Sequence, residues 1–326
     1  MAITTLILAA AIGLQTPAPD ARFELHRKFA AGEKLKYRIE ANVVSEMRDY
    51  EVATYFPSSD GYEYNFSIDV KSVDEDGIAK LIYKRPTMVW ITGENHLRDE
   101  RRQVLKQNYN MELKVSPVND ILDFRDLNED KKKPAKSQSD AFWMLAAPAP
   151  MQQQAIVTQF TNEIFRIALM LGSFDSNFDF APKLPERKVK AGDTWKFTMG
   201  YAPQRLQNDK KKRTVNQRLD FTYKYDGVVQ VEGKSYQRVT ADLSLDSDAA
   251  EMIHQTYGLT TEQTGIKAIK LELKTKLTFD LDMKSLATVR GSAESIGSFR
   301  FDHTQVKGQA VEDGKLKGKV EMFLVK

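Results

Sequence analysis

The feature that most constrains the fold is a regular alternation of apolar and polar residues over several long segments. The longest alternating apolar set is Ile269, Leu271, Leu273, Thr275, Leu277, Phe279, Leu281 and Met283. Successive side chains of a β-strand point to opposite faces, so a period of two predicts strands with one buried face and one face in water. This pattern is typical of antiparallel sheets, because the strands of parallel sheets are usually apolar on both faces.

Residues 34–43, 62–70 and 219–225 alternate in the same way. At about 3.3 Å per residue, residues 269–283 alone would span roughly 50 Å as a strand. Strands of this length twist and coil, which favours a strongly curved sheet or a partly open barrel. We therefore expect a mainly β protein (β-rich α+β) built from such antiparallel sheets.

The two halves of the chain share a motif that predicts an internal repeat. Residues 31–39 and 191–199 both follow the pattern Ala-Gly-acid-x-apolar-Lys-aromatic-x-apolar. In each half a later segment, 111–124 or 278–289, has the form of a strand, a turn and a second strand. These similarities predict a duplicated β unit. The alternative is that any strand that follows a Gly-acid turn has this appearance.

Between the two halves, residues 151–171 carry an apolar stripe at helical spacing, which predicts one central amphipathic helix. The chain then divides into 22–140 as the first β half, 141–181 as the linker and central helix, and 182–326 as the second β half.

An aromatic segment precedes this helix, and the two together are the candidate for an apolar cavity between helix and sheet. The residues are Phe142, Trp143, Ile156, Phe160 and Ile164. The alternative is that these side chains form a solid part of the core.

Residues 1–19 have the form of a secretory signal peptide, because an apolar run is followed by a small, polar, proline-containing stretch. Only the amino terminus supplies positive charge before the run, so the alternative is a buried N-terminal element. No later segment approaches the roughly 18 apolar residues of a membrane-spanning helix. We expect an exported protein, periplasmic or secreted, without a stable transmembrane anchor.

Motifs for catalysis and cofactor binding are missing from the sequence. The four histidines form neither an HxH nor an HExxH pair, and there is no cysteine. There is also no G-x-S-x-G segment and no phosphate-binding glycine loop. The formal charge of +3 is too small to favour nucleic acid as a partner. We therefore expect no enzymatic activity, no cofactor and no metal site.

A family resemblance rests on the segments Phe-Ala-Ala-Gly-Glu at 29–33 and Leu-Pro-Glu-Arg-Lys-Val-Lys-Ala-Gly-Asp-Thr-Trp at 184–195. Together with the two-half layout, they resemble a functionally uncharacterised family of exported bacterial β-rich proteins with repeated Gly-[Asp/Glu]-x-[Leu/Trp]-Lys-aromatic strands. The resemblance implies export and a β architecture, and it supplies no catalytic residues.

These observations favour a non-enzymatic exported protein that binds an apolar or amphipathic ligand, such as a lipid or a small apolar molecule, between sheet and helix. The alternative is a structural or protein-interaction module of the cell envelope, with an envelope protein as its partner. A hydrolase with dispersed carboxylates ranks last, because nothing in the sequence selects a pair of acids.

Overall fold

One antiparallel sheet contains all the strands of the part of the chain that the structure describes. This computed structural model describes residues 22–48, 55–94, 101–128, 181–201, 217–248, 250, 254, 260–305 and 308–325. The strands are β1 (Lys34–Arg48), β2 (Phe56–Val73), β3 (Ala79–Glu94), β4 (Arg101–Val115), β5 (Ile121–Asp126), β6 (Thr194–Tyr201), β7 (Gln217–Val231), β8 (Lys234–Asp248), β9 (Ile266–Leu281), β10 (Thr288–Gln305) and β11 (Gly308–Val325). A short helix, α5 (Thr261–Thr264), precedes β9.

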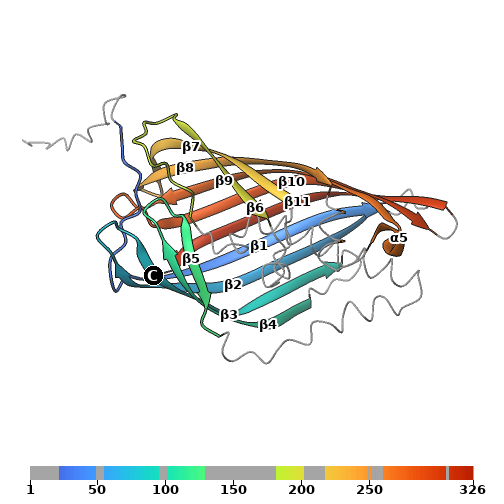
Figure 1. Ribbon diagram of the computed structural model, residues 1–326, viewed down its shortest axis with the longest axis horizontal. Coiled ribbons are helices and arrows are strands. Elements are labelled where there is room, and N and C mark those ends of the chain that lie inside the picture. Colours follow the sequence, from blue (N-terminus) through green and yellow to red (C-terminus); the bar gives the residue numbers. More distant parts are fainter. Residues whose placement is uncertain are drawn as a thin grey trace, which may run out of the picture.

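The order of the strands in the sheet is β5-β4-β3-β2-β1-β11-β10-β9-β8-β7-β6. Figure 1 shows β1, near the start of the chain, beside β11 at its end, in the middle of the sheet. The two strands pair antiparallel from Lys36–Val325 to Arg48–Asp313. The strands of both halves therefore form one continuous, open sheet, whose edges are β5 and β6.

In the alternating segments, most of the apolar residues are buried and most of the polar residues between them are exposed. Along β9, Leu271, Leu273 and Leu277 are buried, whereas the lysines and the glutamate between them are exposed. The prediction of a mainly β, antiparallel fold is therefore confirmed. Met283, which the alternation included, lies beyond the end of β9 and is exposed. The predicted central helix lies outside the described residues.

Among the described residues, no helix combines the length and apolar character that crossing a membrane would require.

The turns before β1 and β6 have the same backbone geometry. Gly32 and Gly192 adopt left-handed φ values of 83° and 92°, a conformation that costs energy for any residue with a Cβ. Each turn is then tied to the second strand of its half by the same two hydrogen bonds. In the first half, the Gly32 N–H donates to the Val70 oxygen and the Val70 N–H donates to the Glu33 oxygen. In the second half, the Gly192 N–H donates to the Tyr225 oxygen and the Tyr225 N–H donates to the Asp193 oxygen.

The register of the strands extends this correspondence from β1–β5 to β6–β10. The matching cross-strand pairs are Leu35–Ile68 with Trp195–Tyr223, Val70–Leu81 with Tyr225–Val239, Leu81–Leu113 with Val239–Phe279, and Val115–Ile121 with Leu281–Thr288. The turns between the last two strands also agree, since Asn119 and Leu286 both have positive φ. These paired positions of the first half thus correspond in register to positions of the second half, and β11 is the additional strand.

A buried carboxylate joins three strands on the face opposite to the apolar one. Asp280 of β9 is 2% exposed and lies between Arg238 of β8 and Arg290 of β10. Its oxygens accept hydrogen bonds of 2.7 and 3.0 Å from Arg238, and of 2.9 and 3.2 Å from Arg290. Burial favours the neutral carboxyl, but the two arginines outweigh it and lower the pKa of Asp280.

Asp280→Asn is expected to lower the free energy of unfolding by roughly 2 kcal/mol at pH 7, because hydrogen bonds to a charged group are lost. A lowered native pKa stabilises the fold above the unfolded pKa of about 4, and this contribution disappears as the pH falls through the native pKa. Urea unfolding at pH 7 and pH 3 should therefore show a difference between wild type and variant that shrinks in acid. Asp123→Asn, at an exposed site on β5, is the control, and a difference independent of pH would contradict the assignment.

Candidate functional site

The five residues predicted to line a cavity, Phe142, Trp143, Ile156, Phe160 and Ile164, lie outside the described residues. The described residues form a different apolar pocket, against the part of the sheet built from β1 to β4. The cavity has a volume of about 50 Å³. Together with the solvent at its open side, the empty space measures about 550 Å³.

The wall of the pocket consists of inward-facing residues of the first half. The aliphatic strand residues are Leu35, Ile68, Val70, Leu81, Leu113 and Val115. They are neighbours because the register places Leu35 opposite Ile68, and Leu81 opposite both Val70 and Leu113. The strand alternation therefore makes this wall apolar, and the pairing of the strands makes it continuous.

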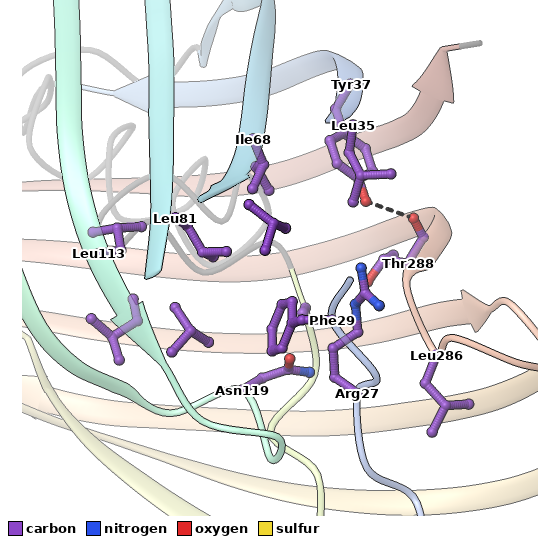
Figure 2. A pocket seen from close by; sticks show the side chains of 14 residues that line it. Arg27, Phe29, Leu35, Tyr37, Ile68, Leu81, Leu113, Asn119, Leu286 and Thr288 are labelled. Atoms are coloured by element: carbon purple, nitrogen blue, oxygen red, sulfur yellow. Dashed lines mark hydrogen bonds between the residues drawn. The ribbon is translucent and has the colours of Figure 1, made fainter. Parts of the chain in front are cut away.

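The remaining lining comes from chain segments that are far apart in the sequence. Phe29 and Arg27 precede β1, Asn119 lies in the turn between β4 and β5, and Leu286 and Thr288 border the start of β10. Figure 2 shows Arg27, Tyr37 and Thr288 together at one end of the pocket, with Leu81 and Leu113 further away. The pocket thus has an apolar wall and a polar end.

Arg27 at the polar end is a buried cation with a partly buried counter-ion, Glu33. The Arg27 side chain is 4% exposed, and it binds both carboxylate oxygens of Glu33 at 2.8 and 2.7 Å. The guanidinium also donates to the Ser285 oxygen at 3.0 Å and lies 4.6 Å from the centre of the Phe29 ring. Both of the hydrogen bonds to Glu33 come from the same guanidinium nitrogen, Nη2, and the ion pair neutralises the charge of both groups.

Two more polar side chains at the pocket already have partners in the protein. The Tyr37 hydroxyl donates to the Thr288 backbone oxygen at 3.0 Å, and burial raises the pKa of Tyr37 well above its usual value, so the phenol stays protonated. The Asn119 amide donates to the Pro182 oxygen at 2.8 Å. These hydrogen bonds hold the end of the pocket in place.

Thr288 differs from these residues. It is 3% exposed, and its hydroxyl oxygen has no hydrogen-bond partner within the part of the chain that the structure describes. Buried hydroxyls are nearly always paired, because the loss of water costs free energy that a hydrogen bond must offset. An unpaired hydroxyl that lines a pocket is therefore a candidate contact for a ligand.

Aromatic rings occupy the corresponding positions of the second half. The pairs of counterparts are Leu35 and Trp195, Ile68 and Tyr223, Val70 and Tyr225, and Leu113 and Phe279. Trp195 stacks on Tyr223 at 5.7 Å and donates a 2.8 Å hydrogen bond to the Lys183 oxygen, and the Tyr225 hydroxyl donates to Gln237. The first half has space where the second half has rings.

The sequence contained one signal of this pocket. Leu35 and Trp195 occupy the same position of the repeated motif. A comparison of residue size between the two halves would therefore have indicated space in the first half. Nothing local marks Arg27, Asn119 or Thr288, which meet only through the pairing of distant strands.

The polar groups of the pocket could orient a bound molecule. The lining of the pocket offers an apolar wall, a neutralised ion pair and one buried hydroxyl that has no hydrogen-bond partner among the described residues. Within the described residues, no three His, Cys, Asp or Glu side chains come together in a way that could hold a metal ion.

No protein-family model matches the chain, and no curated protein does. Solved structures with some similarity include one described as "Lipid-protein interactions in lipovitellin", with 11% sequence identity and a TM-score of 0.41. That match covers 91% of this chain and 25% of the lipovitellin chain, so this chain spans about a quarter of that protein's length. Another is Pseudomonas aeruginosa OccK7 (OpdD), with 9% identity, a TM-score of 0.22, and coverage of 90% of this chain and 99% of the other. Both TM-scores are below 0.5, so neither similarity enters the functional argument.

Proposed function

We propose that the protein binds a small apolar molecule, or the apolar end of an amphipathic one, in the pocket beneath β1–β4. The observation that carries this proposal is the partly open pocket, whose strand wall is aliphatic and whose polar end is held by buried hydrogen bonds. Small-molecule sites are typically concave and mostly apolar, with a few fixed polar groups. The pocket has this composition.

The comparison of the two halves supports the proposal. The shared turns and register support the idea that the halves are duplicated copies around one curved sheet. The second copy carries the rings of Tyr223, Tyr225 and Phe279 at the positions equivalent to those of the pocket wall. The backbone shared by the two copies therefore does not by itself require a pocket. The smaller side chains of the first copy are what open the space.

A non-enzymatic role outside the cytoplasm is part of the same proposal. The apolar segment within residues 1–19 supports export, and the family resemblance of residues 29–33 and 184–195 supports it too. A ligand of low water solubility would be consistent with a carrier or a sensor in the cell envelope.

Leu113→Phe tests the site by copying its counterpart Phe279 into the pocket. We expect purified, delipidated wild-type protein to bind the neutral fluorescent probe N-phenyl-1-naphthylamine, and the variant to bind it at least about tenfold more weakly, because a ring would fill the space at constant hydrophobicity. Titrations followed by probe emission measure both affinities.

Leu122→Phe is the matched control, because it makes the same exchange at an exposed position of the neighbouring β5, where Leu122 is 55% exposed. We expect it to bind the probe like the wild type. A wild-type protein that takes up no probe, or a Leu113→Phe variant with unchanged affinity, would contradict the proposed function.

A role as a protein-interaction module of the cell envelope is the second candidate. The observation that favours it is the exposed apolar pair Leu122 and Phe124, 55% and 61% exposed, on the edge strand β5. An edge strand has unpaired backbone groups that can pair with another chain. This role would be supported if an envelope protein co-purified with the wild type and not with the Phe124→Ser variant. Binding of the probe in the pocket would not support it.

A further inference from the structure

From the polar end of the pocket we infer that the ligand is uncharged and carries a hydrogen-bonding group, such as a hydroxyl or a carbonyl, that pairs with the Thr288 side chain. This inference rests on the proposed function and narrows its ligand class. It excludes carboxylates and phosphates as the groups that enter the pocket.

The hydroxyl of Thr288 is the first part of the argument. Its backbone oxygen already accepts a hydrogen bond from Tyr37, whereas its side-chain oxygen has no partner within the described residues and is buried. A threonine hydroxyl can donate one hydrogen bond and accept others. It can therefore pair with either an alcohol or a carbonyl, and either would remove the cost of a buried unpaired hydroxyl.

The repeat shows that the scaffold does not require a hydroxyl at this position. The counterpart of Thr288 is Ile121, which follows the equivalent turn and lines the same pocket. An apolar β-branched residue thus fits the backbone of such a position. The threonine adds a polar atom to the pocket that strand pairing does not use.

The charges at the pocket are the second part of the argument. Arg27 is the charged side chain among the described residues that line it, and both oxygens of Glu33 bind its guanidinium. An anionic ligand would have to displace Glu33 or lie close to its carboxylate, in surroundings where two like charges are costly. A neutral head group avoids both penalties.

Thr288→Val removes the hydroxyl and keeps the shape of the side chain. At pH 7, displacement of N-phenyl-1-naphthylamine by 1-hexanol, hexane and hexanoate gives the three affinities. We expect the variant to bind 1-hexanol about three- to tenfold more weakly than wild type, the value of one hydrogen bond, and hexane with unchanged affinity. We also expect wild type to bind hexanoate more weakly than 1-hexanol.

Thr275→Val is the matched control, because it removes a buried hydroxyl that does have a partner, Ser295 at 2.7 Å, away from the pocket lining. It should leave all three affinities unchanged. Equal losses for 1-hexanol and hexane in Thr288→Val, or tighter binding of hexanoate than of 1-hexanol by wild type, would overturn the inference while the pocket function stands. Absence of binding of every probe to wild type would instead refute the proposed function itself.

Discussion

Arg27→Met is expected to lower the free energy of unfolding by about 3 kcal/mol or more, because it leaves Glu33 as a largely buried charge without its partner. The ion pair, in which Nη2 of Arg27 binds both oxygens of Glu33 at 2.7 and 2.8 Å, is the main compensation for the loss of water around both groups. The same guanidinium also binds the Ser285 oxygen, so the segment before β1 would lose one of its two hydrogen bonds to the Ser285 oxygen in the turn before β10 and keep the one from the Lys28 N–H. Urea unfolding at pH 7, followed by tryptophan fluorescence and circular dichroism, measures the change.

The chain contains a matched control in its second half. Arg187 lies six residues before Asp193, as Arg27 lies six residues before Glu33, but Arg187 is 55% exposed and its distance to the carboxylate is 3.4 Å. An exposed ion pair contributes about 0–1 kcal/mol, so Arg187→Met should change stability little. Equal losses in the two variants would show that burial of the Arg27 pair is energetically unimportant. The double variant Arg27→Met, Glu33→Gln should recover part of the loss, because no unpaired charge remains.

Gly314→Val is expected to destabilise the protein by about 3 kcal/mol, because there is no room for a side chain in the middle of the sheet. A Cβ at Gly314 of β11 would lie 2.4 Å from the Phe299 ring of β10 and 2.9 Å from the Glu46 oxygen of β1. Phe299 lies directly opposite Gly314 in the register, so its ring covers the glycine. Backbone and ring would both have to move, at the place where the two halves of the sheet meet.

Gly233→Ala separates this steric effect from the conformational freedom of glycine. Gly233 has a φ of +77°, and no atom of the described residues lies within 4 Å of the position that a Cβ would take there. Its substitution therefore introduces backbone strain alone, about 1 kcal/mol. Phe299→Leu in the Gly314→Val background should restore part of the stability, because it removes the ring that the new side chain meets. If Gly314→Val costs no more than Gly233→Ala, the close packing of β10, β11 and β1 is not a stability determinant.

The sequence by itself determined that the long alternating segments are strands and which side of each of these strands is buried. Alternation is a local property, since successive side chains of an extended chain must point to opposite faces. Alternation was therefore sufficient to predict that Leu271, Leu273 and Leu277 of β9 are buried, and that the sheet is antiparallel. The Gly-acid motifs at Gly32 and Gly192 likewise identified two turns with matching backbone geometry, because left-handed φ values select glycine locally.

The candidate site could not be predicted in the same way. Among the predicted cavity residues, Ile156 follows from helical periodicity and Phe142 from the aromatic segment before the helix, and both lie outside the described residues. The described pocket instead depends on Arg27, Asn119 and Thr288, which no sequence pattern connects.

Only the tertiary structure decided which strands are neighbours. The backbone hydrogen bonds that pair strands are the same for every sequence, so alternation specifies a face but not a partner. The pairing of β1 with β11 brings residues from the two ends of the chain together, and the turn before β10 then reaches the segment before β1 through Lys28 and Ser285. The polar end of the pocket exists because these distant segments meet, and its apolar wall is continuous because the pairing of β1 to β4 brings the aliphatic residues together.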